Sequence, residues 1–159
     1  MSLCKDDVVR ALHQALREEL DAIERVAAMA RDEATNSETK AEGKYDTRAT
    51  EASYLARGQA WRIAELRRLD AWYARLEVNR PLEGIRVHVG TLVELEGERQ
   101  DWVFLAPSGG GSVEVDGHRI RVISLSSPLG KGLADLEPGD AFEVDSPRGL
   151  LEYEVLRVL

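Results

Sequence analysis

The sequence contains a single cysteine, Cys4, and no apolar stretch approaches the roughly 20 residues of a membrane span. One cysteine is too few for a disulfide framework or a cysteine-based zinc site within the chain. The N-terminus, M-S-L-C-K-D-D, lacks the basic residues and the long apolar run of a secretory signal. We therefore expect a soluble, cytoplasmic protein that does not contact a membrane.

Motifs of self-sufficient catalysis are also missing. The chain has no Gly-rich phosphate loop, no nucleophile elbow and no His-Glu zinc motif. Its three histidines, His13, His88 and His118, are scattered along the chain, and none has a carboxylate at helical spacing that would suggest a pair of metal ligands. We predict that the protein is not an enzyme in its own right and holds no tightly bound cofactor.

Positive charge is scarce in the second half of the chain. Residues 1–80 carry 14 Lys and Arg against 15 Asp and Glu, a net charge of −1, whereas residues 81–159 carry 7 against 14, a net charge of −7. Phosphate backbones are bound by clustered Lys and Arg. Direct nucleic-acid binding by the C-terminal half is therefore not expected.

Two segments of the first half have apolar residues at steps of three and four, the spacing of one helical face. The first stripe is Val9, Leu12, Leu16, Leu20, Ile23, Val26/Ala27 and Ala30, and the second is Leu55, Gln59, Ile63, Leu66, Leu69/Asp70, Tyr73 and Leu76. Neither helix can bury its stripe alone, so residues 1–79 should form a monomeric antiparallel coiled-coil hairpin. Trp61 and Trp72 should thicken this seam, and the second helix should end near Asn79-Arg80-Pro81.

The pattern after Pro81 changes to short strand-like runs separated by turn signals. Asp116-Gly117 predicts a type I′ hairpin in which Val115 faces His118, Glu114 faces Arg119 and Val113 faces Ile120. Ser127-Pro128 predicts the start of a short helix, and Ser146–Gly149 predicts a turn between the last two strands. Residues 80–159 should form a small, mainly antiparallel β domain with one short helix, so the fold class is α+β.

The hairpin tip, about residues 32–51, is acidic and nearly free of large apolar residues. Glu38, Glu42 and Asp46 are four residues apart, so they share a face if helix is retained there. Such carboxylates can hold a hard cation such as Mg²⁺. The alternative is an ordinary solvated hairpin end, with Lys44 and Arg48 in weak local ion pairs.

The C-terminal segment resembles a known family. I-S-L-S-S-P-L-G-K-G-L at 123–133 and L-E-P-G-D-A-F-E-V-D-S-P-R-G-L-L-E-Y-E-V-L at 136–156 are similar, in order and spacing, to the end of the bacterial Gre transcription elongation factors, the GreA/GreB family. V-G-T-L-V at 89–93 and R-I-A-E-L at 62–66 also resemble that family's first β strand and second helix.

The resemblance implies an FKBP-like β domain that docks at the secondary channel of RNA polymerase, and a coiled coil that reaches toward the nascent RNA 3′ end. It implies that tip acids share Mg²⁺ with the polymerase and stimulate cleavage of backtracked RNA. Carried over, the tip acids are Glu42 and Asp46, with Glu38 in reserve and Lys44 or Arg48 positioning RNA phosphate. The corner that meets the polymerase rim is Ser127, Pro128, Leu129, Gly130 and Lys131.

The tip departs from the family pattern, and other functions therefore stay open. The family tip reads roughly G-D-L-S-E-N-A-E-Y, whereas this chain has T-K-A-E-G-K-Y-D-T-R and reproduces no D-x-x-E pair. One alternative is a Gre-like channel regulator of RNA polymerase that does not stimulate cleavage. Another is an FKBP-like prolyl isomerase, although the few aromatic residues of the β domain are expected in its own core.

Overall fold

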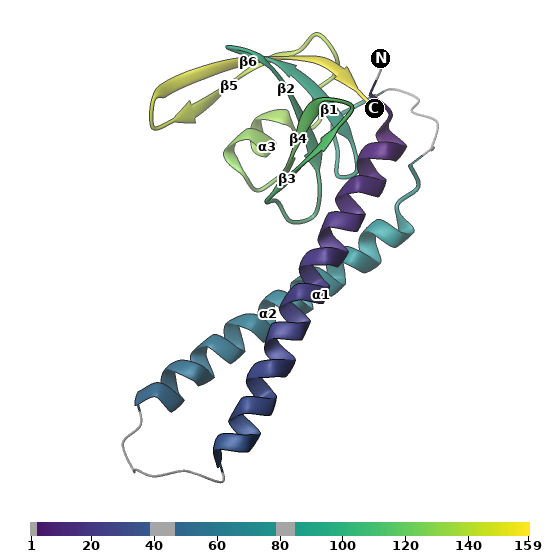
Figure 1. Cartoon of the computed structure of the whole chain (residues 1–159). Coiled ribbons are helices and arrows are strands. Elements are labelled where there is room, and N and C mark those ends of the chain that lie inside the picture. Colours follow the sequence, from purple (N-terminus) through teal and green to yellow (C-terminus); the bar gives the residue numbers. More distant parts are fainter. Residues whose placement is uncertain (1–2, 39–46, 79–84) are drawn as a thin grey trace. The chain divides into compact units, whose positions relative to one another are not determined.

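The computed structural model describes residues 3–38, 47–78 and 85–159 (Figure 1). The chain divides into two compact units: one comprises residues up to Leu12 together with Arg75–Leu159, and the other is His13–Ala74. The first contains the β sheet and the second contains most of both long helices. The predicted domain boundary, between residues 79 and 80, lies outside the described residues.

Two long helices form the N-terminal part, as the apolar spacing predicts. Helix α1 spans Lys5–Glu38 and helix α2 spans Thr47–Arg75. Helix α2 therefore ends four residues before the predicted position at Asn79. In the described part of the chain, no helix combines the length and the apolar character that crossing a membrane requires.

The predicted apolar stripes are buried at one end only. Leu66, Leu69 and Tyr73 of α2 are at most 9% exposed, and Ile63 is half-buried. Further toward the start of the helix, Leu55 is 69% exposed, although it was predicted to lie in the seam. On α1 the last large stripe residue, Val26, is 53% exposed. The seam prediction is thus correct for the second half of α2 and wrong at Leu55.

The two tryptophans of α2 differ in the same way. Trp72 is half-buried and makes an edge-to-face contact with Tyr73, with ring centroids 4.9 Å apart. Trp61 is 66% exposed, so it does not thicken the seam. Burial of Tyr73 also raises the pKa of its phenol to about 12, because an apolar surrounding disfavours the phenolate.

Charged side chains bridge the helices. The Arg62 guanidinium lies 2.6 Å from the Glu19 carboxylate, and that of Arg67 lies 2.5 Å from Glu24. The His13–Asp70 contact and the Glu19–Arg62 ion pair run in opposite directions along the two helices, as in an antiparallel hairpin. Arg62 also contacts Glu65, and the Glu19 hydrogen bond is the main cause of its raised pKa.

The β domain is one six-stranded sheet with the strand order β3-β4-β2-β1-β6-β5. Its strands are β1 (Leu92–Glu96), β2 (Gln100–Leu105), β3 (Ser112–Val115), β4 (His118–Ile123), β5 (Ala141–Ser146) and β6 (Gly149–Val158), and the short helix α3 spans Pro128–Leu133 between β4 and β5. The α+β class is confirmed. The sheet is mixed rather than purely antiparallel, because β2 and β4 pair in parallel.

The predicted hairpin register is confirmed residue by residue. Val115 pairs with His118, Glu114 with Arg119 and Val113 with Ile120. Asp116 and Gly117 have φ of 50° and 76°, as a type I′ turn requires at both central positions. The turn at Ser146–Gly149 also forms, with Ser146 paired to Gly149.

One side of the sheet and α3 enclose the core. Its buried members are Val87, Val93, Leu95, Val103, Leu105, Ile123, Leu133, Val155 and Val158. Val87 precedes β1; its backbone N–H donates to Leu136 O and its carbonyl accepts from Asp135 N. This link ties the segment before β1 to the turn that follows α3.

Candidate functional site

The tip residues on which the predicted chemistry depends fall largely outside the described residues. Glu42, Lys44 and Asp46 belong to residues 39–46, which the structure does not describe. Glu38 is the last residue of α1 and Arg48 is the second residue of α2, and their side chains are not described either. The assignment of the tip acids therefore stays a prediction.

The described part of the chain holds no group of three or more His, Cys, Asp or Glu side chains that could bind a metal ion. Asp32 and Glu33, the first acids of the tip, are exposed on α1.

The second predicted site, the corner at Ser127–Lys131, is fully described. Ser127 caps α3: its Oγ accepts from Gly130 N at 3.1 Å and donates to the Ser124 carbonyl at 2.7 Å. Pro128 occupies the first turn of the helix, where its missing N–H costs nothing. The cap explains why Ser and Pro stand together here.

Close packing requires glycine at two positions of α3, Gly130 in the corner and Gly132 just after it. A Cβ on Gly130 would lie 2.0 Å from the Ser124 carbonyl oxygen. A Cβ on Gly132 would lie 2.6 Å from the Phe142 ring. Both distances are far below a van der Waals contact, so the backbone of α3 can approach its neighbours only because these residues lack side chains.

Leu129 and Lys131 differ in their surroundings. Leu129 is half-buried and packs against the core of the β domain. Pro128 and Lys131 are exposed. Of the five residues predicted to meet a partner, three therefore have evident folding roles, and only Pro128 and Lys131 have their side chains free on the surface.

A polar contact that the sequence analysis missed joins the helices near Leu66. The Asp70 carboxylate oxygen Oδ1 lies 2.6 Å from His13 Nε2 and accepts a hydrogen bond from Arg17 Nε at 2.8 Å. The His13 ring also stacks on Tyr73, with centroids 5.5 Å apart. Arg17, and then His13, hold the pKa of Asp70 below its usual value. Asp70 within an apolar stripe was the available signal, because a polar group in a seam needs a partner on the facing helix.

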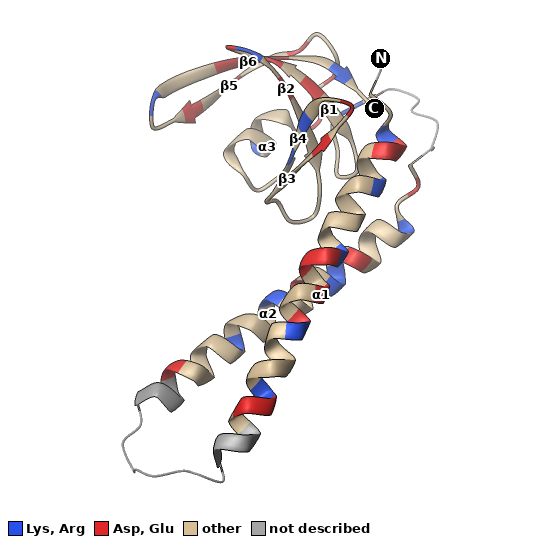
Figure 2. Ribbon diagram, viewed as in Figure 1, with Lys and Arg blue, Asp and Glu red and all other residues tan. Residues whose placement is uncertain are grey.

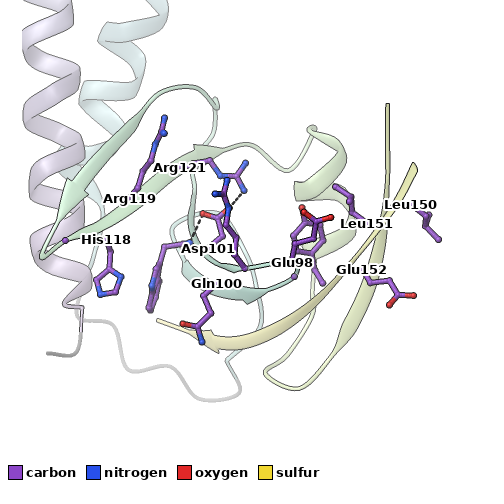
Figure 3. A pocket seen from close by; sticks show the side chains of 14 residues that line it. Glu98, Gln100, Asp101, His118, Arg119, Arg121, Leu150, Leu151 and Glu152 are labelled. Carbon is purple, nitrogen blue, oxygen red and sulfur yellow. Dashed lines mark hydrogen bonds and ion pairs between the residues drawn. The ribbon is translucent and has the colours of Figure 1, made fainter. Parts of the chain in front are cut away.

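The β domain has a depression of about 1110 Å³ beside β2, β4 and β6 (Figure 3). Arg121 and Asp101 form an ion pair within it, and His118, Arg119 and Glu152 lie around it. Acids and bases are mixed in the lining, so no single ligand charge is favoured. The lining also includes Trp102, Tyr153, Leu150 and Leu151, so charged, aromatic and apolar side chains are mixed in it.

Comparison with known proteins shows which family this chain is similar to. Residues 85–159 match the family model described as "Transcription elongation factor, GreA/GreB, C-term". A transcription elongation factor GreA of Nitratidesulfovibrio vulgaris is 36% identical over 81 residues, covering 48% of this chain and 47% of that protein. The GreA of Mesorhizobium japonicum is 33% identical over 111 residues, covering 69% of this chain and 66% of that protein.

The chain thus spans about half the length of the first curated relatives that it matches. A crystal structure of Thermus aquaticus Gfh1 is 22% identical, and the match covers 94% of both chains with a TM-score of 0.40. The matched segment contains the whole described β sheet, the Ser127 cap and the two closely packed glycines of α3. The chain belongs to the GreA/GreB family of transcription elongation factors.

Proposed function

We propose that this protein is an accessory factor of bacterial RNA polymerase that binds at the secondary channel and stimulates cleavage of backtracked RNA. The observation that carries the proposal is the family match over residues 85–159, which includes the α3 corner. The protein acts as a monomer in the cytoplasm, where the polymerase works. It has no active site of its own and contributes groups to that of the polymerase.

In this proposal the β domain docks and the hairpin delivers carboxylates. Pro128 and Lys131 supply exposed contacts at the α3 corner, while Ser127, Leu129 and Gly130 hold the corner in shape. An exposed turn of helix that is fixed by a side-chain cap and two tight glycine contacts is a rigid docking element, and rigid elements lose little entropy on binding.

The tip acids Glu42 and Asp46 carry the chemistry. Carboxylate oxygens are the donors that Mg²⁺ prefers, and the ion usually takes only one or two of them from a protein. Mg²⁺ shared with the polymerase would activate water for attack on the RNA phosphate. Glu42 and Asp46 would hold and orient that shared site, with Glu38 in reserve, and Lys44 or Arg48 would position the phosphate.

A second candidate function is regulation of RNA polymerase from the same channel without cleavage. The observation that favours it is the tip sequence T-K-A-E-G-K-Y-D-T-R, which contains no D-x-x-E pair. In that case the protein would bind equally well, but its tip would change initiation or pausing only by occupying the channel.

The test uses the full-length protein with core RNA polymerase and a stalled, backtracked complex carrying labelled RNA. The variant Glu42→Ala/Asp46→Ala should bind polymerase within about twofold of wild type and lose cleavage stimulation. The matched control is Asp32→Ala/Glu33→Ala, which removes two exposed carboxylates of α1 and should retain it. Binding without cleavage by the wild type would favour the regulator. Absence of binding would refute both functions.

A further inference from the structure

The outer face of α2 carries an unusual set of exposed side chains. Tyr54, Trp61 and Arg68 follow one another at steps of seven residues, and Arg57 lies between the two aromatic residues on the same side. Seven residues are nearly two helical turns, so these side chains form one row with a spacing of about 10.5 Å. We call Tyr54, Arg57, Trp61 and Arg68 the outer stripe.

The outer stripe is turned away from the seam. Tyr54 is 68% exposed and Trp61 is 66% exposed, and both arginines are exposed as well. The seam residues of the same helix, Leu66 and Leu69, are at most 9% exposed. Large aromatic side chains lose stabilising burial when they stay in water, since each can bury about 150–250 Å². Their exposure in a row is therefore the feature that needs an explanation.

The arginines of α2 separate into two groups. Arg62 and Arg67 point to the facing helix and pair with Glu19 and Glu24. Neither Arg57 nor Arg68 forms an ion pair with a carboxylate among residues 3–34, 51–78 and 85–159, the side chains that the structure describes. Arg57 instead lies 6.0 Å from the centre of the Tyr54 ring. Figure 2 shows the basic residues distributed along α2.

Helix α2 carries three carboxylates, those of Glu51, Glu65 and Asp70. Glu51 is exposed and lies three residues before Tyr54, whereas the Glu65 side chain is only 19% exposed and is held by Arg62 at 2.9 Å. The outer stripe thus offers two aromatic rings and two guanidinium groups that form no ion pair within the described part of the chain. Trp, Tyr and Arg are the residues most enriched among those that dominate binding energy in protein interfaces.

We propose that the outer stripe is a docking face that lies in an acidic groove of RNA polymerase, with Trp61 and Tyr54 in apolar pockets and Arg57 and Arg68 paired with partner carboxylates. This inference rests on the proposed function and assigns the contact face on the hairpin. A helix that presents anchors at i, i+3 and i+7 is typical of helix-in-groove recognition. Charge complementarity requires that the groove carry carboxylates.

A protein groove fits the outer stripe better than a nucleic acid does. Proteins that bind single strands use a positively charged groove that follows the backbone, whereas an isolated helix face is convex. Arg57 and Arg68 are eleven residues apart, about 16 Å along the helix, which is too sparse to follow successive phosphates.

The experiment measures the affinity of the full-length protein for core RNA polymerase. Trp61→Ala and Arg68→Glu should each weaken binding at least tenfold. The effect of Arg68→Glu should shrink as the salt concentration rises, because exposed charge pairs are screened. The matched controls on the other helix are Met29→Ala, at a residue 64% exposed, and Arg25→Glu, at an exposed residue; both should bind within about twofold of wild type. All four variants should melt as wild type does.

Three results would overturn the outer stripe as a polymerase-docking face. Equal binding by wild type, Trp61→Ala and Arg68→Glu would remove this face from the interface while leaving the proposed function intact. If Trp61→Ala and Arg68→Glu lose the wild-type protein's binding to a single-stranded RNA oligonucleotide but keep its affinity for polymerase, the face binds nucleic acid instead. A wild-type dimer in sedimentation that Trp61→Ala converts to a monomer, again with unchanged polymerase affinity, would assign it to a second copy. If wild type does not bind polymerase at all, the proposed function itself fails.

Discussion

Replacing Gly130 with alanine tests the geometry of the α3 corner. The added Cβ would lie 2.0 Å from the Ser124 carbonyl oxygen and 2.9 Å from the Leu125 Cα. Both neighbours are backbone atoms, so no side-chain rotation can relieve the clash. Either α3 or the segment after β4 must move by about 1 Å, since a Cβ and an oxygen normally stay more than about 3 Å apart.

The cost follows from what that movement breaks. The Ser124 carbonyl accepts hydrogen bonds from both the backbone N–H and the side chain of Ser127, and Ser127 Oγ in turn caps Gly130 N. Loss of a cap costs about 1 kcal/mol, and forcing extra volume into a packed site costs about 1–3 kcal/mol. Together they predict a loss of about 2–4 kcal/mol. In a domain of this size that lowers the melting temperature by roughly 10–20 °C.

Gly58 supplies a matched control. It also lies inside a helix, but a Cβ there would meet no atom within 4 Å. Gly58→Ala should therefore stabilise α2 by about 0.5–1 kcal/mol, because alanine has less freedom to lose on folding. Differential scanning calorimetry of both variants gives the comparison. A Gly130→Ala protein that melts within about 2 °C of wild type would show that the corner is not packed as described.

Three further predictions use other parts of the molecule. Leu66→Ala should lower the free energy of unfolding by about 2–4 kcal/mol, measured by urea denaturation, because Leu66 is only 1% exposed; an unchanged midpoint would contradict the seam. Asp70→Asn should destabilise the hairpin by up to about 1 kcal/mol at neutral pH. Because the pKa of Asp70 is lowered in the folded protein, its carboxylate stabilises the fold fully when the pH is above 3.8, the ordinary pKa of an aspartate. This stabilisation is lost as the pH falls through the folded-state pKa. Melting curves of wild type and Asp70→Asn should therefore converge in acid, and a constant difference would refute the linkage. Lys131→Glu should weaken polymerase binding severalfold without changing the melting temperature, since Lys131 is exposed; unchanged affinity would remove it from the interface.

The register of the β3–β4 hairpin could be predicted because it is local. A two-residue Asp-Gly turn fixes which residues face each other, and Val115 and His118 follow directly. The parallel pairing of β2 with β4 could not be predicted in the same way. It depends on the path of residues 106–111, where Gly110 and Gly111 both have positive φ, and turn chemistry does not state which strand the chain will join afterwards.

Apolar spacing identified the correct faces of the two long helices but not how far the burial extends. A period of three and four residues states which side of a helix is apolar, not how closely a second helix approaches it. Leu66 and Leu55 have the same place in the pattern, yet their exposed fractions are 1% and 69%. The His13–Asp70 contact does not follow from spacing along one helix, because the two residues lie on different helices.

The α3 motif shows why a sequence that identifies a family does not by itself identify an interface. Ser127 is needed as a cap, Gly130 to approach a carbonyl oxygen, and Leu129 to pack on the core. Leu129→Asp would bury a charge, so a loss of polymerase binding by that variant would report unfolding as readily as a lost contact. Lys131→Glu avoids this ambiguity, because its side chain contributes neither to the cap nor to the core. Docking at this corner is therefore best tested at the residue of the motif on which the fold depends least.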